Sequence, residues 1–265
     1  MAWAGQVQAG NFASTQSGSW GNAATWGGAG VPGCADTVTI SLGHTVTLDT
    51  TRCSADLTIN GTLDMFNTFL EFQGTTFTNN GAVANTTGGQ LDFNGVGGVS
   101  GTTQTIAGNG TWNTNGPVGV NVINSTTVTP ASSTSLDGIY LLTVTNGSSL
   151  SLSSALIIKN ASGTTTVNIN AGGTIGGAGL LKTQGTVTLN SSGSLSAPLE
   201  VVSGTTTGNG NFGQVTIDNG ATLRQNATLT PNGNFMIASG GTLDMFNTFL
   251  EFQGTTFTNN GAVAN

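Results

Sequence analysis

The sequence predicts an all-β fold, a single-stranded β-solenoid of about 20 residues per coil with an N-terminal cap. Short segments that alternate apolar residues with Thr or Ser recur along the chain, which is typical of half-buried strands. Equivalent positions recur at intervals of about 20 residues, as when residues 57–59 repeat the pattern of residues 38–40. Asn-Gly pairs, which favour sharp corners, lie between these segments. Hairpins would also explain those pairs, but hairpins impose no such register, so a coil is favoured.

Residues 1–30 are the first predicted unit, a cap over the end of the solenoid or an assembly segment. This stretch is rich in Gly, Ser, Ala and Asn, yet it carries Trp3, Trp20 and Trp26. Large aromatic side chains in a segment of small residues are expected to cover the first coil and to protect it from edge pairing. An aromatic platform for sugars is the alternative.

Residues 31–265 are the predicted solenoid, which begins with the alternating segments 37–42 and 45–48. Apolar residues of such segments are expected to point inward and to stack from coil to coil, while Thr and Ser point outward. The expected inward residues are Val38, Ile40, Leu57, Ile59, Leu63, Met65, Leu91, Phe93, Tyr140, Leu142, Val167, Ile169, Val187, Leu189, Val215 and Ile217.

Cys34 and Cys53 are the only cysteines, and their spacing in the sequence equals that of Val38 and Leu57. Stacking of successive coils would place their Cα atoms about 5 Å apart, which suits a disulfide. The sequence therefore predicts a bond between them and an oxidising, extracytoplasmic setting.

Residues 61–85 recur letter for letter as residues 241–265. The offset between the copies is a whole number of coils if each coil has about 20 residues. Both copies are therefore expected on one face, with the same strands and turns. Each copy is too aromatic for a single buried face, so its rings either fill a wide core or form a contact patch. The aromatic residues concerned are Phe66, Phe69, Phe72, Phe246, Phe249 and Phe252.

The end of the chain is the second copy, which is ordinary repeat. A last coil of this kind exposes strand edges and a cross-section of the core, so it is expected to need a cover.

Charge is sparse, with 6% charged residues, four basic residues and a net charge of −7. Such a chain cannot form the basic face that nucleic acid requires. No apolar run approaches the length of a membrane span. The acidic residues are scattered without recurring basic partners, so we expect no enzymatic activity, no cofactor and no metal site.

The N-terminal part resembles the opening of bacterial secreted cell-surface proteins, in which a tryptophan-bearing cap leads into a right-handed β-helix. The resemblance is carried by Trp20, Trp26, residues 30–32, 36–40, 43–49 and 57–63. The remainder is similar to repeats of bacterial adhesins and autotransporter passengers. The resemblance implies right-handed winding, a location outside the cell or on its surface, and a role in adhesion or matrix.

Three functions stay open. The first is a subunit of an extracellular filament or matrix, assembled head to tail with copies of itself. The second is a monomeric stalk fragment of a long bacterial adhesin. The third is a carbohydrate- or ice-binding β-helix, with surface polysaccharide as an alternative partner. A flat Thr ladder is disfavoured, because residues such as Asn168, between Val167 and Ile169, interrupt it.

Overall fold

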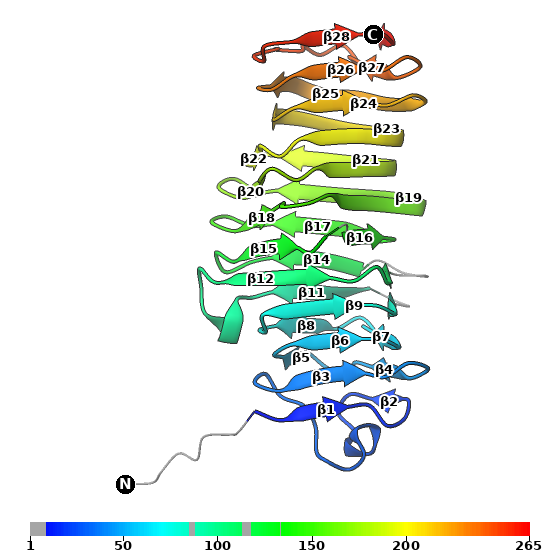
Figure 1. Cartoon of the computed structure of the whole chain (residues 1–265), viewed down its shortest axis with the longest axis vertical. Coiled ribbons are helices and arrows are strands. Elements are labelled where there is room, and N and C mark those ends of the chain that lie inside the picture. Colours follow the sequence, from blue (N-terminus) through cyan, green and yellow to red (C-terminus); the bar gives the residue numbers. More distant parts are fainter. Residues whose placement is uncertain (1–8, 85–87, 113–117, 133) are drawn as a thin grey trace.

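The computed structural model describes residues 9–84, 88–112, 118–132 and 134–265. They form a parallel β-solenoid of about ten turns, with about 21 residues per turn (Figure 1). Among the described residues the only helices are two short 3-10 segments, η1 (Ala23–Trp26) and η2 (Val96–Gly98). The predicted fold is confirmed, whereas the right-handed winding stays a prediction.

Each turn contributes to three faces, which we number in the order in which the chain visits them. Four long strands cross corners between faces: β19 (Leu156–Ile169), β21 (Leu181–Ser191), β23 (Leu199–Phe212) and β25 (Ala221–Pro231). Face 1 consists of β1 (Asn11–Ala13), β3 (Thr37–Ile40), β6 (Leu57–Ile59), β9 (Thr76–Asn79), β12 (Thr103–Ala107), β15 (Thr127–Pro130), β18 (Ser149–Ser151), β20 (Thr174–Gly176), β22 (Ser194–Leu195) and the ends of β23 and β25.

The other two faces are built in the same way. Face 2 consists of β2 (Gly18–Ser19), β4 (Thr45–Thr47), β7 (Thr62–Asp64), β10 (Ala82–Ala84), β13 (Thr111–Trp112), β16 (Thr134–Asp137), the starts of β19, β21 and β23, and then β24 (Val215–Ile217), β26 (Phe235–Ile237) and β28 (Phe257–Asn259). Face 3 consists of β5 (Arg52–Ser54), β8 (Phe69–Phe72), β11 (Gly89–Phe93), β14 (Val118–Val122), β17 (Leu141–Val144), later parts of the long strands, β27 (Thr242–Asp244) and β29 (Ala262–Ala264).

Turn length varies along the solenoid. The predicted spacing holds at the start, where Val38 pairs with Leu57 and Leu57 pairs with Phe77. The next turn is longer, because Phe77 pairs with Ile106 and the loop with η2 lies between them. A turn near the other end is shorter, since Leu195 pairs with Phe212. The repeat is therefore approximate, although strand pairing continues through it.

The core is a column of apolar side chains that point inward from the three faces. Every residue expected to point inward is buried except Tyr140, whose side chain is 53% exposed. That prediction was wrong because Tyr140 precedes β17 at a corner, so the alternation of the strand does not govern it. An aromatic cluster in the core consists of Phe72, Phe77 and Phe93, with ring centroids 5.4–5.9 Å apart, and of Trp112, which stacks on Phe77.

Glycine is required at the corner between faces 1 and 2, where successive turns approach closely. A Cβ atom added at Gly81 would lie 2.0 Å from the carbonyl oxygen of Gly61, and one added at Gly61 would lie 2.2 Å from that of His44. The backbone must move before any side chain fits there. Gly119 on face 3 differs, since its added Cβ would meet nothing closer than 3.8 Å.

We expect Gly81→Ala to lower the free energy of unfolding by about 3 kcal/mol, because overpacking forces two turns apart. Gly119→Ala is the matched control and should change the stability little. Chemical denaturation of both variants measures the difference. Equal stabilities would show that the corner can relax around a methyl group.

Candidate assembly site

The N-terminal end of the solenoid is closed by the two tryptophans of the cap. Trp20 and Trp26 are buried, and their rings meet edge to face with centroids 5.2 Å apart. The Trp20 indole N–H donates to the carbonyl of Pro32, and that of Trp26 donates to the carbonyl of Trp20. Both rings therefore cover the first turn, as expected of a cap. Trp3 lies outside the described residues.

Solenoid pairing begins within the segment assigned to the cap. Strand β1 pairs in parallel with β3, and β2 pairs with β4, so residues 11–19 already form a rung. Helix η1 follows β2 and contributes Trp26 to the cap. Asp36 fastens the chain where it enters β3, because its carboxylate accepts from the backbone N–H groups of Gly10 and Gly33.

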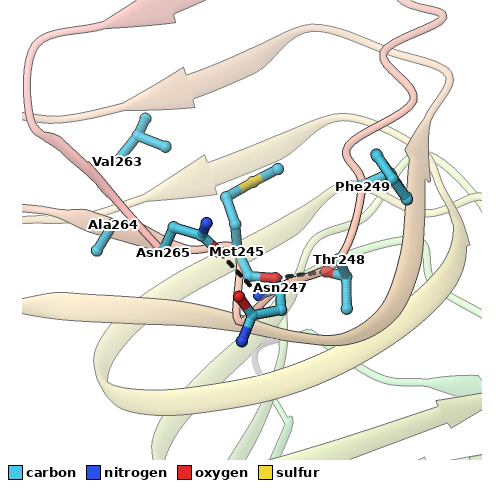
Figure 2. A pocket seen from close by; sticks show the side chains of 7 residues that line it. All are labelled: Met245, Asn247, Thr248, Phe249, Val263, Ala264 and Asn265. Carbon is cyan, nitrogen blue, oxygen red and sulfur yellow. Dashed lines mark hydrogen bonds between the residues drawn. The ribbon is translucent and has the colours of Figure 1, made fainter.

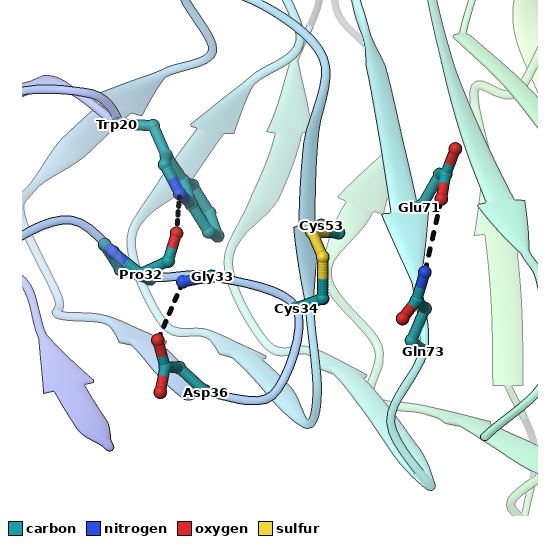
Figure 3. Close-up of a disulfide and its surroundings, with 8 residues drawn as sticks. All are labelled: Trp20, Pro32, Gly33, Cys34, Asp36, Cys53, Glu71 and Gln73. Carbon is teal, nitrogen blue, oxygen red and sulfur yellow. Dashed lines mark hydrogen bonds between the residues drawn. A yellow bond between two sulfur atoms is a disulfide. The ribbon is translucent and has the colours of Figure 1, made fainter. Parts of the chain in front are cut away.

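The predicted disulfide between Cys34 and Cys53 is confirmed, with Cα atoms 4.6 Å apart (Figure 3). Cys53 lies on β5 of face 3, and Glu71 pairs with it in the next turn. The bond thus joins the segment leading out of the cap to the first complete turn. A disulfide is compatible with an extracellular protein.

Replacing both cysteines by alanine should cost about 3 kcal/mol, because the bond closes a short loop in the unfolded chain. The solenoid is held by contacts between neighbouring turns, so the loss should be local. Hydrogen exchange should therefore accelerate in residues 10–60 and stay unchanged in residues 215–244. An equal change in both regions would contradict a local role.

The two copies of the duplicated segment lie on different faces, so the prediction of one shared face is wrong. In the first copy, β7 lies on face 2 and β8 on face 3. In the second copy, β27 lies on face 3, and Leu250 pairs with Leu229 on face 1. Every element of the second copy is therefore displaced by one face. The prediction assumed that all the turns between the copies have the same length, and these turns differ in length.

The tight turn is nevertheless the same in both copies, although Phe69–Phe72 form β8 whereas residues 249–252 form only an isolated bridge at Leu250. Phe66 and Asn67 have φ angles of 38° and 56°, and Phe246 and Asn247 have 43° and 58°. In each copy the preceding aspartate accepts from the phenylalanine N–H, at 3.2 Å and 3.1 Å. A bulky residue with positive φ is uncommon. The segment therefore determines its own turn, whichever face it occupies.

The neighbours of the copies differ, because one lies inside the rod and the other forms its last turn. Phe77 is fully buried, whereas its counterpart Phe257 is 40% exposed. Val83 is 1% exposed beneath Trp112, whereas Val263 is 50% exposed. The wide-core explanation therefore holds for Phe72 in the first copy.

The remaining aromatic residues of the two copies lie partly or largely at the surface. Phe66, Phe69, Phe246 and Phe249 are exposed, and Phe252 is half-buried. The Arg224 guanidinium lies over the Phe246 ring, 5.1 Å from its centroid. These side chains are available for contacts outside the core.

The last turn carries an open hollow of about 420 Å³ (Figure 2). Its lining residues are Met245, Asn247, Thr248, Phe249, Val263, Ala264 and Asn265. The Asn265 side chain accepts from the Asn247 N–H, and the Thr248 hydroxyl donates to the Met245 carbonyl. Strands β28 and β29 pair with the preceding turn, and within the described residues no strand pairs with their other edge.

Ion pairs between turns involve three of the four basic residues. Lys159 pairs with Asp137, Lys182 with Glu200, and Arg224 with Asp244, while Arg52 pairs with Asp49 within one corner. Each pair is partly exposed, so its contribution to stability is small.

Two carboxyl groups have raised pKa values. Burial raises the pKa of Asp92, and the charge of Glu71 adds to this, although hydrogen bonds from Asn121 and Gln90 oppose it. Burial, together with the charge and hydrogen bonding of Glu200, raises the pKa of Asp218, while Lys182 opposes the shift.

The raised pKa of Asp92 predicts a dependence of stability on pH. The contribution of Asp92 to the free energy of unfolding is fully present below its unfolded pKa, near 3.8. That contribution is lost as the pH rises through the pKa of Asp92 in the folded protein. Asp92→Asn keeps an oxygen for Gln90 and Asn121, so it should raise Tm at about pH 7 and leave it unchanged at about pH 3. Glu251→Gln, at an exposed carboxylate, should change neither value. A lower Tm for Asp92→Asn at neutral pH would contradict the expectation.

Across the described residues, no helix has the length and apolar character needed to cross a membrane, and no three His, Cys, Asp or Glu residues are grouped to hold a metal ion. No protein-family model, no curated protein and no solved structure matches the chain. The fold, the cap, the disulfide and the last turn are therefore the observations on which a function can be argued.

Proposed function

We propose that this chain is an extracellular structural protein, a subunit of a surface filament or matrix that assembles head to tail. The observation that supports the proposal best is the pair of identical segments. Inside the rod, the segment is covered by a further turn. At residues 241–265 the same side chains are exposed, so this surface has the composition that a further turn covers elsewhere in the molecule.

The first copy indicates what the terminal turn can accept. Above Val83 lies a parallel strand that brings Trp112 into register over it. Val263 therefore offers a site for a strand that carries a large aromatic side chain. Trp20 and Trp26 are buried in their own cap, so we assign the contact to the segment before β1 of a second copy, which carries Trp3.

Such a contact joins two different surfaces, so it does not close on itself and propagates into fibres. Sparse charge favours this, because few like charges repel one another between subunits. The disulfide fits a location outside the cell or on its surface. We propose no catalysis, cofactor or metal for this role. A monomeric stalk within a longer bacterial adhesin is the competing function.

Light scattering and electron microscopy of the purified chain test the assembly. The wild type should form rods that lengthen with protein concentration. Val263→Lys should raise the concentration needed for assembly at least about tenfold, since covering an unpaired ammonium group costs more than about 1.4 kcal/mol. Trp3→Ala should act in the same direction.

Phe66→Lys is the control, because Phe66 is exposed at a corner of the first copy, away from the last turn. This variant should assemble like the wild type. A wild type that stays monomeric at every concentration would contradict assembly and favour the stalk.

A further inference from the structure

We propose that face 1 is an ice-binding surface, formed by an array of threonine and serine hydroxyl groups. The inference goes beyond the structural role, because it assigns the side of the rod a ligand of its own, crystalline water. It depends on the lateral surface and not on either end of the solenoid.

From β3 to β22, eight consecutive turns each place a row of two outward residues on face 1, and β12 has a third outward residue, Ala107, opposite Thr78. Fourteen of these sixteen residues are Thr or Ser, and the exceptions are Asp56 and Gly176. The rows are Thr37 and Thr39, Asp56 and Thr58, Thr76 and Thr78, Thr103 and Thr105, Thr127 and Thr129, Ser149 and Ser151, Thr174 and Gly176, and Ser194 and Ser196. The residue between the two members of every row is buried, so all the rows point to one side.

Strand register sets the spacing of the array. From β12 to β22 the pairing is parallel and continuous, so Thr103, Thr127, Ser149, Thr174 and Ser194 form one column. Between β9 and β12 the rows shift sideways, because Thr76 pairs with Thr105. Neighbouring rungs are about 4.8 Å apart, and residues i and i+2 about 6.6 Å apart. Figure 1 shows these strands stacked along the rod from β3 to β22.

Hydrogen bonds hold side chains of the array in place at two points. The hydroxyl groups of Thr127 and Ser149 lie 2.9 Å apart, so neighbours in the column interact directly. Asp56 is the one charged member, and its carboxylate is engaged by the N–H groups of Thr75 and Thr76 and by the Thr75 hydroxyl. The array is thus a nearly uncharged lattice fixed by the backbone.

These properties favour ice over a polysaccharide. None of the sixteen residues is aromatic, whereas sugar sites commonly use an aromatic side chain as an apolar platform. Threonine presents a methyl group beside a hydroxyl, so it can hold water at a fixed position without the strong hydration shell of a charge. Planes of ice present oxygens at two fixed spacings of the same order as those of the array.

The array also explains why the sequence pattern looked irregular. Asn168, which seemed to interrupt the Thr ladder, lies on face 3, where it pairs with Thr143 and Asn190. Because Asn168 lies on a different face, it does not interrupt the hydroxyl array of face 1.

Ice-affinity partitioning and thermal hysteresis of the purified chain test the proposal. The wild type should be enriched in a slowly grown ice hemisphere. Thr129→Tyr, in the middle of the array, should reduce this enrichment about tenfold. The large ring would hold face 1 away from the ice surface, so the neighbouring hydroxyl groups would lose their contacts at the same time. Thr216→Tyr is the matched control, since Thr216 is an outward residue of β24 on face 2. It should keep the activity of the wild type.

Circular dichroism and the intact disulfide establish that each variant is folded. A folded wild type that is excluded from ice overturns the proposal, as does an equal loss in the control. Retention on insoluble chitin or cellulose without enrichment in ice would also overturn it and assign face 1 to polysaccharide. Assembly into rods, measured separately with Val263→Lys, should be unaffected by Thr129→Tyr, so the two proposals can fail independently.

Discussion

Parallel hydrogen bonding of each strand to the strand one turn away is the interaction on which the rest of this structure depends. It fixes the distance between turns and places each side chain above its partner. Apolar residues thereby form a continuous core, and the cysteines meet across one turn. The same spacing excludes a side chain at Gly81, where the carbonyl of Gly61 lies directly opposite. The core, the disulfide and the glycine corners are thus consequences of the same strand pairing between turns.

This contact also makes an end of the solenoid different from its interior. A rung satisfies its backbone and covers its side chains only when a neighbour lies on each side. At the N-terminal end, buried Trp20 and Trp26 replace the missing neighbour. At the last turn, Phe257 and Val263 are exposed, although their counterparts Phe77 and Val83 are buried inside the rod. For these two pairs of residues the same sequence has different exposure, because only the first copy has a turn on each side.

The ends and the sides of the rod offer different chemistry. The last turn presents apolar side chains and strand edges, which suit another strand. The side at face 1 presents ordered hydroxyl groups with almost no charge, which suit an ordered polar surface. The proposed head-to-tail assembly would therefore use the ends of the rod and leave face 1 free.

The sequence by itself determined the local features of this protein. Alternation identified the strands and nearly all of the core, and the spacing of one coil paired Cys34 with Cys53. The conformation at Phe66 and Phe246 follows from the identical segment around each residue. The sequence could not assign residues to faces, because the face depends on the summed lengths of all preceding turns. These lengths differ, since the long turn before Ile106 and the short turn before Phe212 lie in the same rod. Only the tertiary structure decided that the copies lie one face apart and that the hydroxyls of face 1 form a continuous array. A longer or shorter turn therefore changes the face that a residue at a fixed sequence offset occupies, although the strands that follow stay in the same stacks.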